Sequence, residues 1–190
     1  MNLTFVVPTI GRTSLLRTLN SITTQMEPGD KLGVVADGFC DQTHELLKTA
    51  NITPDYLISY ARQHGDWGHT PRNNMFKVVE GDYILTLDDD DAYLPGAISL
   101  VRERLKQSEF APHMFKMYWR GRHVLWEQPN VVMQNVSTQM IVTPNVKDKL
   151  GVWGNRYQGD FDYCRSLQDN WGKIVWCPEI IVRYGPDLAG

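Results

Sequence analysis

Four short runs of strand-forming residues alternate with helical segments in the first 90 residues of the chain. The runs at residues 3–7, 31–36, 56–60 and 83–87 are rich in Val, Ile, Leu, Phe and Tyr, which predicts buried strands. Between them, apolar spacing and helix-starting residues predict helices from Thr13 or Ser14 to Met26, from Asp41 or Thr43 onward, and over residues 71–79. A strand–helix repeat of about 25 residues indicates a parallel sheet with right-handed crossovers.

The second half of the chain follows a different pattern. We expect a helix at residues 97–105, strands near 115–119, 123–126 and 138–143, a helix at about 160–171, and strand stretches at 174–176 and 180–182. No linker-like segment interrupts the 190 residues, so we expect one domain over residues 1–190. Residues 1–91 would form a Rossmann-like nucleotide-binding half. Residues 92–190 would complete the sheet and supply the other wall of a cleft.

Four consecutive aspartates, at residues 88–91, directly follow the fourth expected strand. Two carboxylates about 5 Å apart repel each other by roughly 3 kcal/mol at an effective dielectric near 20. Because the strand is buried, the carboxylates emerge where solvation is only partial, and a hard divalent cation held by their oxygens would offset the repulsion. The alternative is a solvated acidic turn that leads into the helix starting near Pro95.

Other polar residues also stand at the ends of expected strands. Thr9 follows the first strand, and Asp37 follows the second. In open α/β sheets, ligands bind beyond the carboxyl ends of the strands. Since the carboxyl ends of parallel strands share one edge, we expect Thr9, Asp37 and the acidic run to belong to one site.

Four segments, taken in order, resemble the family 2 type of GT-A glycosyltransferase. The resemblance covers residues 3–183, which is nearly the whole chain. The segments are VVPTIGR at 6–12, similar to the family's opening strand and turn; VVADGFCD at 34–41, similar to its DDGS-type turn; HTPRNNMFKVVEGDYILTLDDDD at 69–91, similar to its ARN helix, GEY strand and DXD signature; and QGDFDYCRSL at 158–167, similar to its ED-type motif.

This resemblance implies an α/β fold of GT-A type, a three-layer α/β/α sandwich with a mixed, mostly parallel sheet. It also implies metal-dependent, inverting transfer of a sugar from a nucleoside diphosphate sugar, expected to be UDP-linked, to an acceptor hydroxyl, with Mn²⁺ or Mg²⁺ as cofactor. By the same resemblance, Asp90 is the main metal ligand and Asp88 faces the metal or the donor ribose. Asp91 holds a metal-bound water, and Asp89 fills the variable position beside the donor.

The resemblance also assigns donor-binding residues outside the acidic run. Pro8, Thr9 and Arg12 belong to the turn that frames the nucleotide base. Asp37 would accept a hydrogen bond from the imide nitrogen of uracil. Arg72 would contact the diphosphate from the start of its helix, where the helix dipole also favours anions. The alternative interpretations are a turn residue for Asp37 and an exposed, ion-pairing arginine for Arg72.

Asp160 is the expected general base, because inverting transfer needs one carboxylate to take the proton of the acceptor hydroxyl. The family usually has Glu where this chain has Gly159, and this departure leaves Asp162 as a possible substitute. A helix N-cap is the alternative interpretation of Asp160. The chain also lacks the late histidine that many GT-A enzymes supply to the metal. His64 and His69 precede the acidic run and would line the site, with ordinary surface or core positions as the alternative.

Composition limits the other classes of protein. The formal net charge of −3 gives no general attraction to nucleic acid or to an anionic membrane. The three cysteines, Cys40, Cys164 and Cys177, form neither a CxxC pair nor a zinc spacing, which suits a reducing compartment. The sequence shows neither a secretory leader pattern nor a long apolar run, so we expect a cytoplasmic protein without a membrane anchor.

The segment at residues 115–126 bears on the acceptor. Residues 115–126 interleave aromatic side chains with Lys116, Arg120 and Arg122, as in a hairpin around Gly121 or in a nucleic-acid surface. We expect a saccharide or glycan acceptor, with a modified DNA base, as for some phage enzymes resembling this fold, as the alternative. A nucleotidyltransferase of the sugar-nucleotide pyrophosphorylase type and a non-catalytic sugar-nucleotide-binding module are further alternatives.

Overall fold

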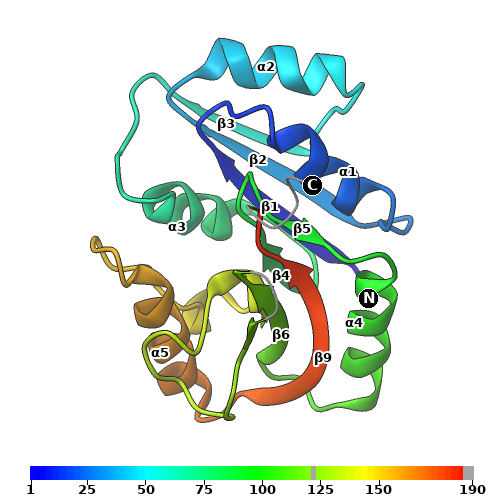
Figure 1. Ribbon diagram of the computed structural model, residues 1–190, viewed down its shortest axis with the longest axis vertical. Coiled ribbons are helices and arrows are strands. Elements are labelled where there is room, and N and C mark those ends of the chain that lie inside the picture. The colour runs from blue at the N-terminus through cyan, green and yellow to red at the C-terminus, as the bar shows by residue number, and fades with distance from the viewer. Residues whose placement is uncertain (121–122, 186–190) are drawn as a thin grey trace.

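The computed structural model describes residues 1–120 and 123–185, and it begins with the alternation that the sequence predicts. In the first half, three helices connect four strands (Figure 1). All seven of these elements were expected, and their ends differ from the predicted ends by a few residues. They are β1 (Leu3–Thr9), α1 (Leu15–Thr23), β2 (Lys31–Asp37), α2 (Cys40–Thr49), β3 (Tyr56–Tyr60), α3 (His69–Val78) and β4 (Tyr83–Thr86).

The second half departs from the prediction at four places, one of which is the short 3₁₀ helix η2, which was not expected. A two-residue strand, β5, was not expected, and part of the strand expected at residues 138–143 is instead the 3₁₀ helix η1. The last strand is continuous, whereas two stretches were predicted. The elements are β5 (Ala92–Tyr93), α4 (Ala97–Gln107), β6 (His113–Trp119), β7 (His123–Leu125), η1 (Thr138–Met140), β8 (Ile141–Pro144), η2 (Lys147–Lys149), α5 (Gly159–Trp171) and β9 (Val175–Arg183).

Pro178 explains why β9 was predicted as two pieces, because proline cannot donate to a strand ladder. The structure keeps one strand by shifting its register against β6. Met114 pairs with Trp176, while Lys116, only two residues later, pairs with Ile180. The bulge takes up the proline without ending the strand. The expected pairing of β6 with β7 is confirmed and antiparallel, and the turn at Gly121 and Arg122 lies outside the described residues.

The strands form one mixed sheet in the order β3-β2-β1-β4-β8-β6-β9-β5, with β7 added to β6. The pairings from β3 to β4 are parallel, which confirms the prediction for the first half. The strands β4, β8 and β6 pair antiparallel, and β6 with β9 is parallel again. The strand order reverses between β1 and β4, because β2 lies on one side of β1 and β4 on the other. Ligands of such sheets bind at this reversal.

Helices cover both faces of the sheet and give three layers. In Figure 1, α3 and α5 lie on one side and α1 and α4 on the other. On the first side, the rings of Phe76 in α3 and Tyr163 in α5 are 6.0 Å apart. All seven residues of β1 are buried, as expected for a strand covered on both faces. Among the described residues, no helix combines the length and the apolar character that crossing a lipid bilayer requires.

β1 continues through Pro8 to Thr9, two residues beyond its predicted end. The Val6 carbonyl accepts a hydrogen bond from the Leu87 amide at 3.1 Å, and Pro8 faces the same neighbour because alternate residues of a strand do so. Pro8 has no N–H with which to extend this ladder. Pairing with β2 nevertheless continues to Thr9 and Ala36. The strands β1 and β4 therefore separate at Pro8, and the acidic run begins at this opening.

Candidate active site

A cavity of about 1860 Å³ opens at the carboxyl ends of β1, β2 and β4. Pockets for one drug-sized ligand are about 300–1,000 Å³, so this volume is sufficient for two substrates. Among the predicted site residues, Asp91, Asp162 and His64 are not in the described lining of the cavity, whereas His69 and nine others are. The nine are Pro8, Thr9, Arg12, Asp37, Arg72, Asp88, Asp89, Asp90 and Asp160.

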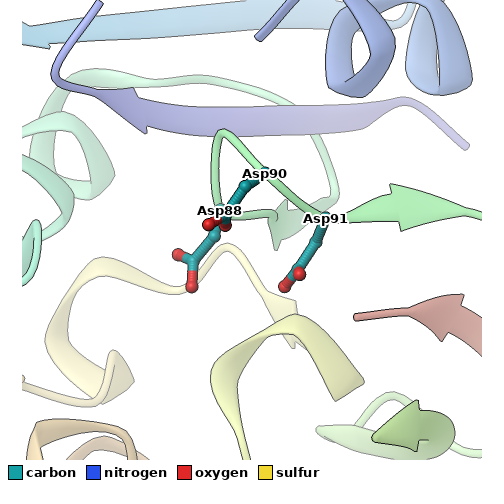
Figure 2. A group of neighbouring side chains, drawn as sticks. All are labelled: Asp88, Asp90 and Asp91. Atoms are coloured by element: carbon teal, nitrogen blue, oxygen red, sulfur yellow. The ribbon is translucent and has the colours of Figure 1, made fainter. Parts of the chain in front are cut away.

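Three of the four consecutive aspartates converge. Figure 2 shows Asp88, Asp90 and Asp91 on the loop between β4 and β5. One carboxylate oxygen from each lies within 4.8 Å of the others. Like charges at this separation repel, so the cluster needs protons or a cation to be stable.

Asp91 provides the strongest indication of a cation. Its side chain is fully buried, and Oδ1 accepts a hydrogen bond from the Gly185 amide at 2.8 Å. Oδ2 is buried and has no partner among the described residues. Burial raises the pKa of Asp91 well above its usual value, and the charges of Asp88 and Asp90 raise it further. An orphaned carboxylate oxygen beside two other carboxylates is a donor set that fits Mg²⁺ or Mn²⁺.

Asp89 turns away from the cluster and joins β1 to the acidic loop. Its Oδ2 accepts hydrogen bonds from the Thr9 hydroxyl at 2.7 Å and from the Ile10 amide at 3.2 Å. Arg12 Nη1 lies 3.2 Å from Oδ1 of Asp89 and 2.9 Å from Oδ2 of Asp90. Asp89 and Thr9 thus fix the turn that carries Arg12, a structural function that the sequence did not predict for them.

Arg72 is buried, which excludes the exposed, ion-pairing arginine of the alternative interpretation. Its guanidinium donates to the Thr86 hydroxyl at 3.2 Å and to the Trp67 carbonyl at 2.9 Å, and it forms an ion pair with Asp88. Burial raises the pKa of Asp88 to about 6, although Arg72 opposes this rise; neighbouring carboxylates, first among them Asp160, add to it. Arg72 therefore holds Asp88 in place.

Two η1-region residues connect the acidic cluster to Asp160. Gln139 Nε2 donates to Asp88 Oδ2 at 2.5 Å, and the side-chain oxygen Oε1 of Gln139 accepts a hydrogen bond from the Ser137 hydroxyl. The Ser137 hydroxyl also lies 2.7 Å from Asp160 Oδ2. Its single proton is shared between these two acceptors. Neither Ser137 nor Gln139 belongs to a recognisable motif, so sequence reasoning missed both.

Asp160 lies in the first turn of α5, which begins at Gly159. Ser137 binds Oδ2, and the Thr138 hydroxyl donates to Oδ1 at 3.0 Å. Asp160 is not a helix cap, because Gln158 holds the cap position and the described Asp160 contacts come from the η1 region. The structure thus places the carboxylate in the cavity with its orientation fixed.

Asp162 has a different environment. It forms an ion pair with Arg156, whose Nε donates to Asp162 Oδ2 at 2.7 Å. This hydrogen bond lowers the pKa of Asp162. The structure does not bring Asp162 together with Asp160 in the cavity.

Gly159 has a local reason to be glycine. A Cβ at this position would collide with the His69 imidazole, whose Nδ1 and Nε2 atoms would both be 2.6 Å away. His69 itself is 3% exposed and lines the cavity. Burial lowers the pKa of His69, with the charge of Arg72 as the next cause. The departure from the family's usual Glu therefore coincides with a buried, neutral histidine packed against the start of α5.

Asp37 is the last residue of β2, and its carboxylate binds His64. Its Oδ1 lies 2.5 Å from His64 Nδ1 and accepts a hydrogen bond from the His64 amide at 3.1 Å. Asp37 is part of the strand, so the alternative interpretation as a turn residue is wrong. The sequence did not predict this pairing, because the two residues come from separate elements.

Comparison with known proteins agrees with this geometry. A family model described as "Glycosyl transferase family 2" matches residues 4–152. The chain belongs to this family. The family resemblance predicted from the four sequence segments is thereby confirmed.

Individual relatives of this family 2 chain are distant. The GalNAc(5)-diNAcBac-PP-undecaprenol beta-1,3-glucosyltransferase of Campylobacter jejuni is 29% identical over 115 residues, covering 60% of this chain and 37% of that protein. The crystal structure of S. aureus TarS 1–349 has a TM-score of 0.79 at 20% identity, covering 97% of this chain and 60% of TarS 1–349. Its complex with UDP-GlcNAc gives 0.79 at 18% identity, with 96% and 58% covered. These structures confirm the GT-A type of fold, and the chain spans less than two thirds of each relative.

Proposed function

We propose that this protein transfers a sugar from a UDP-linked donor to a hydroxyl group of a saccharide or glycan, with Mn²⁺ or Mg²⁺ and with inversion at the anomeric carbon. One observation carries the proposal: the carboxylate cluster adjoins the cavity that Asp160 also lines, and Gln139 and Ser137 connect the two. Family membership supports sugar transfer, and a protein of similar fold was solved with UDP-GlcNAc.

The donor lies along the carboxyl ends of β1, β2 and β4 in this proposal. Pro8 and Arg12 flank the nucleotide base, and Asp37 accepts a hydrogen bond from its imide nitrogen. Thr9 positions Asp89, because its hydroxyl donates a hydrogen bond to Asp89 Oδ2 at 2.7 Å. Arg72 positions Asp88 and does not bind the donor itself, because its guanidinium already binds the Asp88 carboxylate and the oxygens of the Thr86 hydroxyl and the Trp67 carbonyl.

Asp88, Asp90 and Asp91 are the residues that would hold the cation. A bound divalent cation supplies positive charge that stabilises the departing diphosphate. Arg12, beside Asp90 at 2.9 Å, adds a second positive charge at the same edge of the cavity.

Asp160 is assigned as the general base. It takes the proton of the acceptor hydroxyl while that oxygen attacks the anomeric carbon. The hydroxyls of Ser137 and Thr138 fix the carboxylate and leave lone pairs for the acceptor. Asp162 is a weaker candidate, because it pairs with Arg156 and is not among the described residues that line the cavity. A single displacement without a covalent sugar intermediate inverts the configuration.

Isothermal calorimetry with UDP, GDP and dTDP, each with and without Mn²⁺, tests the proposal. We expect UDP to bind most tightly and Mn²⁺ to strengthen that binding. Negligible binding of all three nucleotides would overturn the proposal. Nucleotide binding without hydrolysis or transfer of any UDP-sugar would instead indicate a binding module, and release of pyrophosphate from UTP and a sugar phosphate would indicate a nucleotidyltransferase.

A further inference from the structure

Two large aromatic side chains are exposed at the cavity, although they come from segments 90 residues apart. Trp67 precedes α3 and is 58% exposed, and Tyr157 precedes α5 and is 69% exposed. Their rings meet edge to face with centroids 5.6 Å apart, and both residues line the cavity. Single exposed apolar residues are ordinary, whereas a contacting aromatic pair at a cavity indicates a binding surface.

The position of Trp67 is fixed by residues of the acidic site. Its backbone is left-handed with φ of 57°, a conformation that is rare for a bulky residue and must be held by its surroundings. The Trp67 carbonyl accepts a hydrogen bond from Arg72, whose guanidinium also forms the ion pair with Asp88. The exposed indole is therefore connected to the acidic cluster through a single arginine side chain.

Tyr157 is held near the assigned base, Asp160, by a backbone turn. It precedes Asp160 by three residues, and the Gly159 amide donates to the Arg156 carbonyl at 2.9 Å, which closes a tight turn around Tyr157. His69 joins the two sides, because its ring lies 5.9 Å from the Trp67 ring and packs on Gly159. Burial lowers the pKa of His69, so this aromatic surface is uncharged near neutral pH.

We propose that Trp67 and Tyr157 form the acceptor subsite, in which the apolar face of a pyranose ring lies against the aromatic rings while one of its hydroxyls reaches Asp160. The inference rests on the function proposed above. Aromatic faces carry partial negative charge and attract the weakly positive C–H groups of a sugar ring. Gln63 and Gln158 also line the cavity, and their amides can both donate to and accept from sugar hydroxyls.

The charges in the cavity favour a neutral saccharide over a nucleic acid. Six acidic residues line it, and they outnumber the three arginines, Arg12, Arg72 and Arg120. Arg12 and Arg72 are already paired with members of the acidic run, and Arg120 lies over the ring of Trp119. The six acidic residues are Asp37, Asp88, Asp89, Asp90, Glu127 and Asp160. An oligonucleotide would bring one further negative charge with each phosphate. A saccharide brings none and still uses the aromatic surface.

Tryptophan side-chain NMR tests the subsite directly. The chain has six tryptophans, and the Trp67→Phe variant identifies the indole N–H signal of Trp67 in a ¹⁵N-labelled sample. The probes are the methyl α- and β-glycosides of glucose, galactose, N-acetylglucosamine and N-acetylgalactosamine, titrated with and without UDP and Mg²⁺. We expect at least one glycoside to shift the Trp67 signal saturably. Its affinity should fall by about fivefold to tenfold in Tyr157→Ala, the loss expected for one aromatic contact.

Phe110→Ala is the matched control, because Phe110 is 54% exposed but is not among the described residues lining the cavity. It should leave glycoside affinity unchanged, and all three variants should bind UDP as the unmodified protein does. Failure of UDP binding throughout would contradict the proposed function and not the subsite. With UDP binding intact, the subsite is overturned if no glycoside moves the Trp67 signal, or if single-stranded oligothymidylate moves it and the glycosides do not.

Discussion

Asp160 and Asp162 are two residues apart in sequence but differ in what binds their oxygens. Asp160 accepts from the neutral hydroxyls of Ser137 and Thr138, so it keeps its charge available in the cavity. Asp162 instead forms an ion pair with Arg156, which neutralises its charge. Orientation by neutral donors is suited to a base, since the carboxylate stays fixed without being neutralised.

Replacing Asp160 by Asn tests this assignment. Asn keeps the shape and can still bond to Ser137 and Thr138, but it cannot accept a proton. We expect UDP and Mn²⁺ affinity close to that of the unmodified protein and a turnover about 10²–10⁴-fold lower, measured with a UDP-sugar and an acceptor glycoside. Asp162→Asn is the control and should retain most activity. The opposite pattern would move the base to Asp162.

Asp90→Ala tests the metal cluster at the same scale. The substitution removes one of three convergent carboxylates, and with it an ion-pair partner of the half-exposed Arg12. The metal-free protein should have an equal or higher melting temperature, because relief of repulsion offsets an exposed ion pair that contributes about 0–1 kcal/mol. The gain in UDP affinity on adding Mn²⁺ should disappear. An unchanged Mn²⁺ effect would show that the acidic run is only a turn.

At the scale of elements, α5 is positioned by the contact of Gly159 with His69 of α3. Gly159→Ala places a Cβ against the imidazole, and we expect a loss of about 1–3 kcal/mol in unfolding free energy. In the His69→Ala background the collision is gone, and the same change should stabilise α5 by up to about 1 kcal/mol, since Ala favours helix over Gly. Urea unfolding of the four proteins measures the change of sign. Equal effects in both backgrounds would contradict the proposed contact.

The elements that the sequence predicts well are those whose pattern is local. The strand β1 was predicted from a continuous apolar run, and all its residues are buried in the structure. The helix α1 was predicted from the helical spacing of its apolar residues, and Leu15, Leu19 and Ile22 form one buried stripe. Residues 138–140 were predicted as a strand and form η1, where the Thr138 amide and hydroxyl bind Asp160 instead of a neighbouring strand. Contacts with a residue 22 positions away are not encoded in a local pattern.

At the scale of the whole molecule, the sequence predicted the edge of the sheet where the site lies. Residues at strand ends, such as Asp37 and Asp88, were found because parallel strands bring their carboxyl ends together. Gln139 and Trp67 were missed, since they reach the site only through folding of the later chain and the loop before α3. Family resemblance supplied the roles of the aspartates, and the structure supplied the residues that hold them.

The dependence of global stability on pH gives a last prediction, through His113 in the centre of the sheet. His113 is fully buried, its Nδ1 donates to the Ala111 carbonyl at 2.7 Å, and its Nε2 lacks a partner in the part of the chain that the structure describes. Burial lowers the pKa of His113, so the folded protein keeps it neutral below pH 6.5, where the unfolded chain binds a proton. Stability is therefore lost as pH falls below 6.5, by at most about 1.4 kcal/mol per pH unit for this group.

Other groups act over the same range, so the comparison needs a matched variant. The raised pKa of Asp88, about 6, works in the opposite direction, because stability falls as pH rises from about 4 to 6 while only the unfolded chain ionises. His113→Leu removes one titrating group and leaves Asp88 in place. Between pH 7.5 and 5.5, urea unfolding should show the unmodified protein losing more stability than His113→Leu, by at most about 1.4 kcal/mol. Parallel profiles for the two proteins would mean that His113 has the same pKa in the folded and unfolded chains, contrary to its burial.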